Sequence, residues 1–128
     1  MPGPLSIFYF LILIFSIIVH EVAHGIAAER EGDPTARMLG RITLNPLKHI
    51  DWFGSIILPL ILILTSAGFV VGWAKPVPYN PENLKNGNTS VAKVSIAGII
   101  VNLCIAVVFG LLIRVAMSTG LATQPVIE

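Results

Sequence analysis

Charged residues are scarce in this chain: Asp, Glu, Lys and Arg make up 12% of its 128 residues, and the net charge at pH 7 is +1. A soluble domain averages about 25% charged residues, so this composition argues against an ordinary water-soluble fold. Nucleic-acid binding requires a basic patch or stripe, so we expect no nucleic-acid partner. The single cysteine, Cys104, excludes an intrachain disulfide.

Basic residues are also absent from the first residues of the chain, before the first apolar run. A secretory signal peptide begins with a positively charged region, so the first apolar segment is expected to remain as a membrane helix. Hydrophobic residues make up 55% of the sequence, and the mean hydropathy is +0.84. The sequence therefore indicates an integral membrane protein surrounded by a lipid bilayer.

Three apolar segments are candidate membrane spans, at about residues 5–28, 53–71 and 91–117. A helix of about 20 apolar residues crosses the hydrocarbon core of a bilayer. The predicted fold class is an all-α membrane protein with about three transmembrane helices, forming one domain over residues 1–128. Residues 38–44 have the β-branched and apolar content of a strand, so we expect a short β-hairpin or extended loop between the first two spans.

The two polar loops differ in character. The loop over residues 29–52 contains four Lys or Arg residues, whereas the amino-terminal tail has none. Because cytoplasmic loops accumulate Lys and Arg, this loop is predicted to be cytoplasmic and the amino terminus outside. In the second loop, the alternating prolines of residues 75–81 predict a stiff extended segment. That segment is either a linker or a clamp that pairs with an unwound substrate as an added strand.

The chemistry is concentrated in the sequence HEVAH at residues 20–24, near the carboxyl end of the first span. Residues four apart lie on one face of a helix, so His20 and His24 can hold one zinc ion, with Glu21 beside it as a general base. The plainer interpretation is a chance match, or polar residues that only join helices. Ionisable side chains at mid-bilayer cost roughly 2.5–3.5 kcal/mol each on insertion scales, which favours a functional role.

The surrounding segments extend this motif. The sequence reads HEVAHGIAAEREGDPTAR at residues 20–37, GRITLNPLKHID at 40–51 and GWAKPVP at 72–78, and Ala97 and Gly98 are followed by Asn102. Over about residues 18–106 the chain thereby resembles the site-2 protease family, the intramembrane zinc metalloproteases, in its compact prokaryotic branch. It departs from the family pattern at Trp52 and Ile99, where the family usually has proline.

The resemblance implies a third zinc ligand that the sequence lacks. In the family it is an aspartate in a Leu-Asp-Gly motif on a later membrane helix, and this chain contains no such motif. A catalytic zinc site normally has three protein ligands. His49 and Asp51 are the nearest alternative candidates, although loop hydrogen bonding or a helix cap is the favoured explanation for both. The preferred explanations are that the chain is a fragment of a longer protein or that its remaining helices were lost.

Asn102 is a polar side chain in the middle of the third span. An unsatisfied amide in hydrocarbon is costly, so it requires partners. Two interpretations remain open: support of the zinc ligands or stabilisation of an oxyanion, and simple hydrogen bonding between helices.

The resemblance implies an intramembrane zinc endopeptidase of a prokaryotic cell membrane, a multi-pass protein that cuts membrane-embedded substrates. Water would attack the scissile carbonyl with zinc as the Lewis acid and Glu21 as the general base. The alternative is a catalytically inactive membrane scaffold of the same fold, which the missing ligand favours. A metal-handling protein is a third hypothesis, and Glu21 and the protease-like linkers argue against it. The sequence does not specify the substrate or the oligomeric state.

Overall fold

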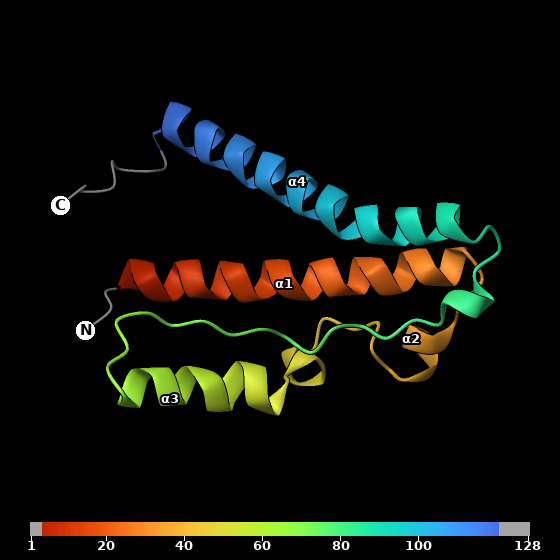
Figure 1. The fold of residues 1–128 in the computed structure, drawn as a ribbon. Helices are drawn as coiled ribbons and strands as arrows, with labels where there is room; N and C mark the ends of the chain where they lie inside the picture. Colours follow the sequence, from red (N-terminus) through yellow and green to blue (C-terminus); the bar gives the residue numbers. More distant parts are fainter. Residues whose placement is uncertain (1–3, 121–128) are drawn as a thin grey trace.

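The computed structural model describes residues 4–120, and it is helical, with no strand in that range. Its elements are α1 (Pro4–Arg30), α2 (Thr35–Met38), the 3-10 helix η1 (Pro46–His49), the π-helix η2 (Trp52–Ile57), α3 (Leu58–Leu64), the 3-10 helix η3 (Pro81–Asn83) and α4 (Asn88–Ser118). Figure 1 shows α1 between α4 on one side and α3 with the 65–80 segment on the other.

The two long helices, α1 and α4, lie next to each other and run in opposite directions (Figure 1). They are closest near the end of α1 and the start of α4, and they diverge toward the other ends. Both are long and apolar enough to cross a membrane, over Ser6–Arg30 and Asn88–Ser118. The full helices α1, Pro4–Arg30, and α4, Asn88–Ser118, contain the predicted spans 5–28 and 91–117.

The side chains that these helices turn away from the protein are apolar. Leu11 on α1 and Leu103 and Ile113 on α4 are each about 60% exposed, and many neighbouring residues are similar. Large apolar side chains in such numbers, unburied on both long helices, form surfaces far larger than a soluble monomer exposes. A hydrocarbon environment accounts for this exposure.

The third predicted span, at residues 53–71, is not confirmed. The apolar helix there is shorter, Trp52–Leu64, and only its second half is α-helical. Pro59 has no amide hydrogen to donate to the carbonyl of Ser55, which is consistent with the wider π-helical turn that precedes it. Beyond Leu64 the chain turns, with Ser66 at φ 52° and Gly68 at φ 83°, so the helix cannot continue.

The strand or hairpin predicted for residues 38–44 is not confirmed either. Residues 39–45 form turns and bends, with Gly40 at φ 68°. The amide of Arg41 bonds to the carbonyl of Ala36 at 2.9 Å, so it closes the turn after α2 and is not available for pairing with a strand. The β-branched content of this segment therefore serves loop packing, with Ile42 against Gly25 of α1.

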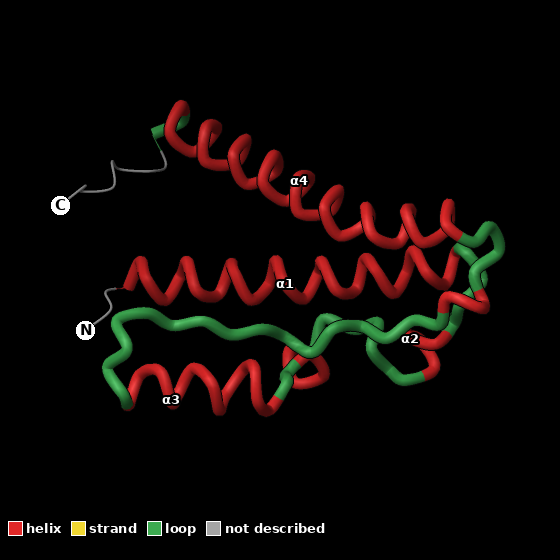
Figure 2. The backbone as a smooth tube through the Cα atoms, in the orientation of Figure 1, coloured by secondary structure: helices red, strands yellow, loops and turns green. Residues whose placement is uncertain are grey.

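The segment from 67 to 80 has no regular secondary structure; it includes residues 75–80 of the predicted extended segment, whereas Pro81 begins η3. Figure 2 shows it as a long loop that runs beside α1 in the same direction, with α3 on its other side. Its backbone is tied to neighbouring elements at alternate residues: the amide of Trp73 donates to Gly54 at 3.0 Å and that of Lys75 to His49 at 2.8 Å. These bonds tie the segment to η2 and to the end of η1.

Candidate metal centre

The functional side chains lie on one seam between α1 and α4. Successive residues on this face of α1 are four apart, Ser16, His20 and His24, and those opposite on α4 are Asn102, Gly98 and Val94. A spacing of four on both helices keeps all six residues on facing sides, because about 3.6 residues make one turn. The seam continues to Glu31, which accepts a hydrogen bond from Ser90 at 2.7 Å.

His20 and His24 converge, as their spacing predicts. Their Nε2 atoms are 2.9 Å apart, and the rings meet edge to face with centroids 4.6 Å apart. Both side chains are half-buried. The two atoms that would bind a metal therefore point toward the same place.

Each imidazole is also held at its other nitrogen by α4. Nδ1 of His24 is 2.6 Å from the carbonyl oxygen of Val94, and Nδ1 of His20 is 3.0 Å from Nδ2 of Asn102. Metal-binding histidines are commonly oriented by a partner on the second nitrogen, which fixes the ring and its tautomer. Asn102 thus touches a candidate ligand directly, and it also accepts a hydrogen bond from Ser16 at 3.2 Å.

Gly98 makes this close approach sterically possible. A Cβ atom placed at Gly98 would lie 2.5 Å from Cε1 and 2.6 Å from Nε2 of His20. Contacts under 3.0 Å essentially never occur, so any larger residue would push the imidazole or the helix away. The absence of a side chain at Gly98 therefore creates the space for the ring of His20.

Glu21 lies on the side of α1 that faces the extended segment. Its Oε2 accepts a hydrogen bond from the amide of Val77 at 2.9 Å. The buried side chain of Val77 also contacts the space above Gly25, since a Cβ there would lie 3.3 Å from its Cγ1. The extended segment therefore holds in place the carboxylate of Glu21, which the sequence predicts to be the general base.

An apolar groove of about 510 Å³ leads along α1 toward Glu21. On α1 it is lined by Phe10, Ile14 and Ile17, which precede Glu21 at helical spacing. Its other walls come from η2, the first turn of α3 and residues 70–74, which precede Val77. The groove therefore runs between the same two segments that meet at the carboxylate.

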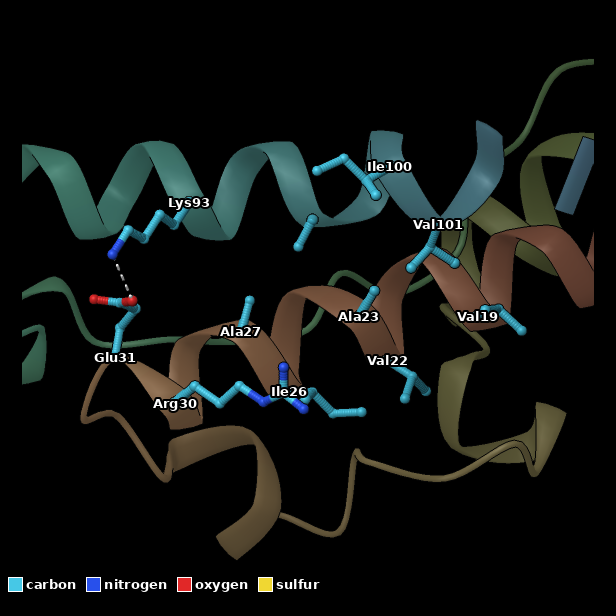
Figure 3. A pocket seen from close by; sticks show the side chains of 11 residues that line it. Val19, Val22, Ala23, Ile26, Ala27, Arg30, Glu31, Lys93, Ile100 and Val101 are labelled. Carbon is cyan, nitrogen blue, oxygen red and sulfur yellow. Dashed lines mark ion pairs between the residues drawn. The ribbon is translucent and has the colours of Figure 1, made fainter. Parts of the chain in front are cut away.

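A second groove, of about 450 Å³, lies between α1 and α4 (Figure 3). Its walls are aliphatic, and at one end Lys93 forms an ion pair with Glu31 at 3.3 Å. The hydrogen bond from Ser90 and the charge of Lys93 hold the pKa of Glu31 below its usual value, against a smaller opposing effect of desolvation. These charges mark the end of the apolar part of the helix pair.

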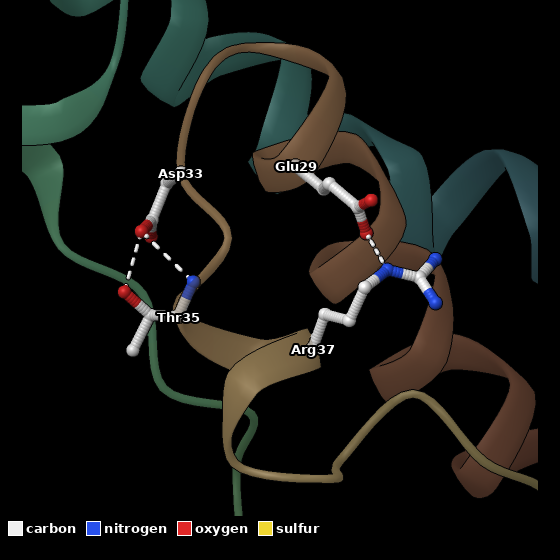
Figure 4. A network of polar contacts seen from close by, with 4 residues as sticks. All are labelled: Glu29, Asp33, Thr35 and Arg37. Atoms are coloured by element: carbon white, nitrogen blue, oxygen red, sulfur yellow. Dashed lines mark hydrogen bonds and ion pairs between the residues drawn. The ribbon is translucent and has the colours of Figure 1, made fainter.

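Asp33 ties the end of α1 to the second loop. Its fully buried carboxylate accepts hydrogen bonds from the amide and hydroxyl of Thr35, the amide of Asn80 at 2.6 Å and the side chain of Asn83 at 3.2 Å. Figure 4 shows the bonds to Thr35, together with the exposed pair of Arg37 and Glu29. Burial raises the pKa of Asp33, but the hydrogen bonds outweigh it and leave the pKa lowered.

His49 and Asp51, the alternative ligand candidates, make loop contacts. Nε2 of the buried His49 is 2.8 Å from the carbonyl oxygen of Thr43. Asp51 caps η2 through the amide of Phe53 and accepts a bond from Nε1 of Trp73 at 2.8 Å, which lowers its pKa. Over residues 4–120, no three His, Cys, Asp or Glu side chains gather closely enough to hold a metal.

The donor set of the pair nevertheless suits zinc. Two nitrogens bound to one tetrahedral zinc at 2.0–2.1 Å would be about 3.3 Å apart, so the observed separation of 2.9 Å is close to the one that zinc binding requires. His20 and His24 are the residues that would hold the ion. A third protein ligand stays a prediction.

Several residues of this centre carry no signal that motif reading detects. Val77 contributes only its backbone amide, which any residue except proline could supply, and Val94 contributes only its backbone carbonyl, which any residue could supply. Gly98 stood in a segment that resembles the family, but its steric role did not follow from that segment, and Ser16 could have been found only by aligning the four-residue steps of the two helices. That alignment depends on the packing of segments about 80 residues apart.

Comparison with known proteins places this arrangement in a family. The sequence profile described as Peptidase family M50 matches residues 8–126. The chain is 42% identical over 130 residues to a Bacillus subtilis (strain 168) protein named "Putative zinc metalloprotease YwhC", covering 92% of this chain and 56% of that protein. The chain thus spans just over half the length of this relative. No solved structure matches this chain. The chain belongs to peptidase family M50, the site-2 protease family of zinc metalloproteases.

Proposed function

We propose that this chain carries the histidine pair and the general base of a zinc endopeptidase that hydrolyses membrane-embedded segments of other proteins. The observation that carries the proposal is the convergence of the Nε2 atoms of His20 and His24 to 2.9 Å, one residue from a carboxylate held by a backbone amide. Zinc held there supplies a Lewis acid that polarises a peptide carbonyl and makes water a better nucleophile.

Glu21 is the proton carrier in this proposal. Val77 occupies Oε2 and fixes the plane of the carboxylate, which leaves Oε1 to receive a proton from the attacking water. The same oxygen then delivers the proton to the amine of the departing peptide. A carboxylate held in place by a backbone amide spends little energy on reorientation during these transfers.

The apolar lining of the groove of about 510 Å³ favours an apolar substrate. Its lining from α1 is aliphatic and aromatic and reaches Ile17 and Ile18, one helical turn before Glu21. An extended peptide of apolar residues lying in this groove would bring one peptide bond to Glu21. The amides of Trp73, Lys75 and Val77 already donate hydrogen bonds within the protein, and Pro76 and Pro78 have no amide hydrogen. Few donors in this segment therefore remain to pair with a substrate strand, so we assign the segment a positioning role and not that of a clamp.

The membrane setting follows from α1 and α4. M50 proteases are typically membrane-embedded, and both long helices pass the length and hydropathy requirements for a span. We propose a multi-pass protein with the loop after α1 on the cytoplasmic side. The bacterial origin of the relative favours a prokaryotic cell membrane.

Glu21→Gln tests the proposal. The full chain, loaded with zinc in micelles or vesicles, is incubated with a peptide containing an apolar membrane segment, and cleavage is followed by mass spectrometry. Loss of the base is expected to lower kcat by at least about 100-fold with zinc still bound. The matched control is Glu29→Gln, on the same helix but in an exposed ion pair, with activity unchanged.

Two outcomes contradict the proposal. Full activity of the Glu21→Gln variant would remove the assigned base, and cleavage that persists after zinc is chelated would remove the metal.

A further inference from the structure

The partners of His20 form a directional chain of hydrogen bonds across the seam. Ser16 donates to Oδ1 of Asn102 at 3.2 Å, and Nδ2 of Asn102 is 3.0 Å from Nδ1 of His20. The Nε2 atoms of His20 and His24 are 2.9 Å apart, and Nδ1 of His24 is 2.6 Å from the carbonyl oxygen of Val94. All these contacts are partly buried between α1 and α4.

Elementary hydrogen-bond chemistry fixes the tautomers of the neutral rings. A carbonyl oxygen only accepts, so Nδ1 of His24 carries hydrogen and its Nε2 has a lone pair. The bond between the two Nε2 atoms then requires the hydrogen on Nε2 of His20. Nδ1 of His20 is left as an acceptor, which matches the donor Nδ2 of Asn102 opposite it.

This arrangement blocks His20 as a ligand. A metal needs the lone pair of Nε2, so the hydrogen of His20 must be on Nδ1 in the metal-bound state. Nδ1 would then need an acceptor, which Asn102 supplies if its amide turns over and presents Oδ1. The amide nitrogen would then face Ser16, whose hydroxyl accepts as readily as it donates.

We propose that Asn102 and Ser16 form a reversible amide relay that positions His20, matching its Nε2–H tautomer without metal and its Nδ1–H tautomer with zinc. The proposal rests on the proposed zinc site, and it assigns Ser16 as a positioning residue. A side chain at position 102 that could only donate or only accept a hydrogen bond would match one tautomer of His20 and not the other. The combination of an amide and a hydroxyl satisfies both without a net change in charge, which suits a site between two apolar helices.

The relay is tested by NMR of the full chain labelled with 15N-histidine in micelles, because two-bond 1H–15N correlations separate the two tautomers. Chelated wild type is expected to show His20 as Nε2–H and the zinc-loaded protein as Nδ1–H. Asn102→Asp is expected to show Nδ1–H before zinc is added, because a carboxylate only accepts. Asn102→Leu and Ser16→Ala are expected to give a tautomer mixture and about 10-fold weaker zinc binding.

Two variants control for a merely structural effect. Ser16→Thr keeps the hydroxyl and is expected to restore the wild-type tautomer. Ser95→Ala removes a hydroxyl of α4 that bonds only to its own helix, to Val91 at 2.9 Å, and is expected to change neither tautomer nor affinity.

The proposal is overturned if chelated wild type already holds His20 as Nδ1–H. It is equally overturned if Ser16→Ala and Asn102→Leu leave both the tautomer and the zinc affinity unchanged. Because the chelated sample needs no proteolysis, an inactive protein with a responsive tautomer would refute the proposed function and leave the relay intact.

Discussion

At the scale of single residues, the absence of a side chain at Gly98 and the presence of one buried carboxylate at Asp33 do the most to shape the site. Gly98 leaves room for the ring of His20, and Asp33 holds the second loop against the end of α1. Neither residue has a role in the proposed chemistry. Both determine where the groups with such a role lie.

Gly98→Ala is expected to disrupt the zinc site. The added Cβ would lie 2.5 Å from the ring of His20, and overpacking of this kind costs about 1–3 kcal/mol. We expect zinc affinity to fall about 10-fold or more in a chelator competition assay. Gly110→Ala in the same helix is the control, because nothing lies within 4 Å of that position, and it should bind zinc as wild type does. Equal affinities in the two variants would contradict the steric role of Gly98.

Asp33→Asn is expected to destabilise the protein in a pH-dependent way. The folded pKa of Asp33 is lowered, whereas an unfolded aspartate titrates near about 3.9. The ionised group therefore stabilises the fold above that value, and this contribution is lost as the pH falls through the lower folded pKa. We expect a loss of about 2–3 kcal/mol at pH 7, measured by thermal unfolding in micelles. The difference from wild type should narrow below about pH 4; a constant difference from pH 7 to pH 3 would argue against the ionised carboxylate as its cause.

At the scale of elements, the extended segment before η3 acts as a brace. Its amides at Trp73, Lys75 and Val77 bond in turn to η2, to the end of η1 and to Glu21 of α1. One piece of chain without secondary structure thus links two helical elements, η1 and η2, to the proposed base on α1. The prolines at 76 and 78 keep it extended.

Val77→Pro removes the amide that holds Glu21, while Val77→Ala keeps it. We expect the proline variant to lose about 10-fold or more in kcat, because a carboxylate free to rotate is less often aligned for proton transfer. Zinc content, measured by elemental analysis, should stay equal in both variants. Similar rates for the two would mean that the hydrogen bond to Oε2 does not position the base.

The elements themselves were predictable to different degrees. α1 and α4 contain the predicted ranges 5–28 and 91–117, because a long apolar run fixes a helix almost independently of context. The prediction for residues 53–71 extended too far, since the turns at Ser66 and Gly68 end the helix before the apolar run ends. The strand expected at 38–44 depended on a partner strand, which the described part of the chain does not provide.

Only the part of the site that lies within one helix could be predicted from the sequence. The four-residue step from His20 to His24 predicts their convergence, and the structure has it. The hydrogen bonds that orient each imidazole and the carboxylate come from segments 56 to 82 residues away. Such contacts follow from the register of α1 against α4, which no pattern within either helix specifies.

At the scale of the whole molecule, we expect the exposed apolar surface of α1 and α4 to face lipid, because both helices are long and apolar enough to cross a membrane. Cys104 provides a probe of this surface, since it is exposed and lies within α4. We expect a charged, water-soluble maleimide to leave Cys104 unlabelled in intact membranes and to label it after the membranes are dissolved in denaturant.

The same experiment tests the orientation. A cysteine introduced as Lys48→Cys, in a Cys104→Ser background, lies in η1 on the loop predicted to be cytoplasmic. It should react in inverted vesicles and stay protected in right-side-out ones. The reverse pattern would place this loop outside and overturn the orientation drawn from the basic residues.

For the labelling of Cys104, the contradicting result is rapid reaction in sealed membranes. It would mean that this face of α4 meets water and not hydrocarbon, and α4 could then not be a lipid-facing span.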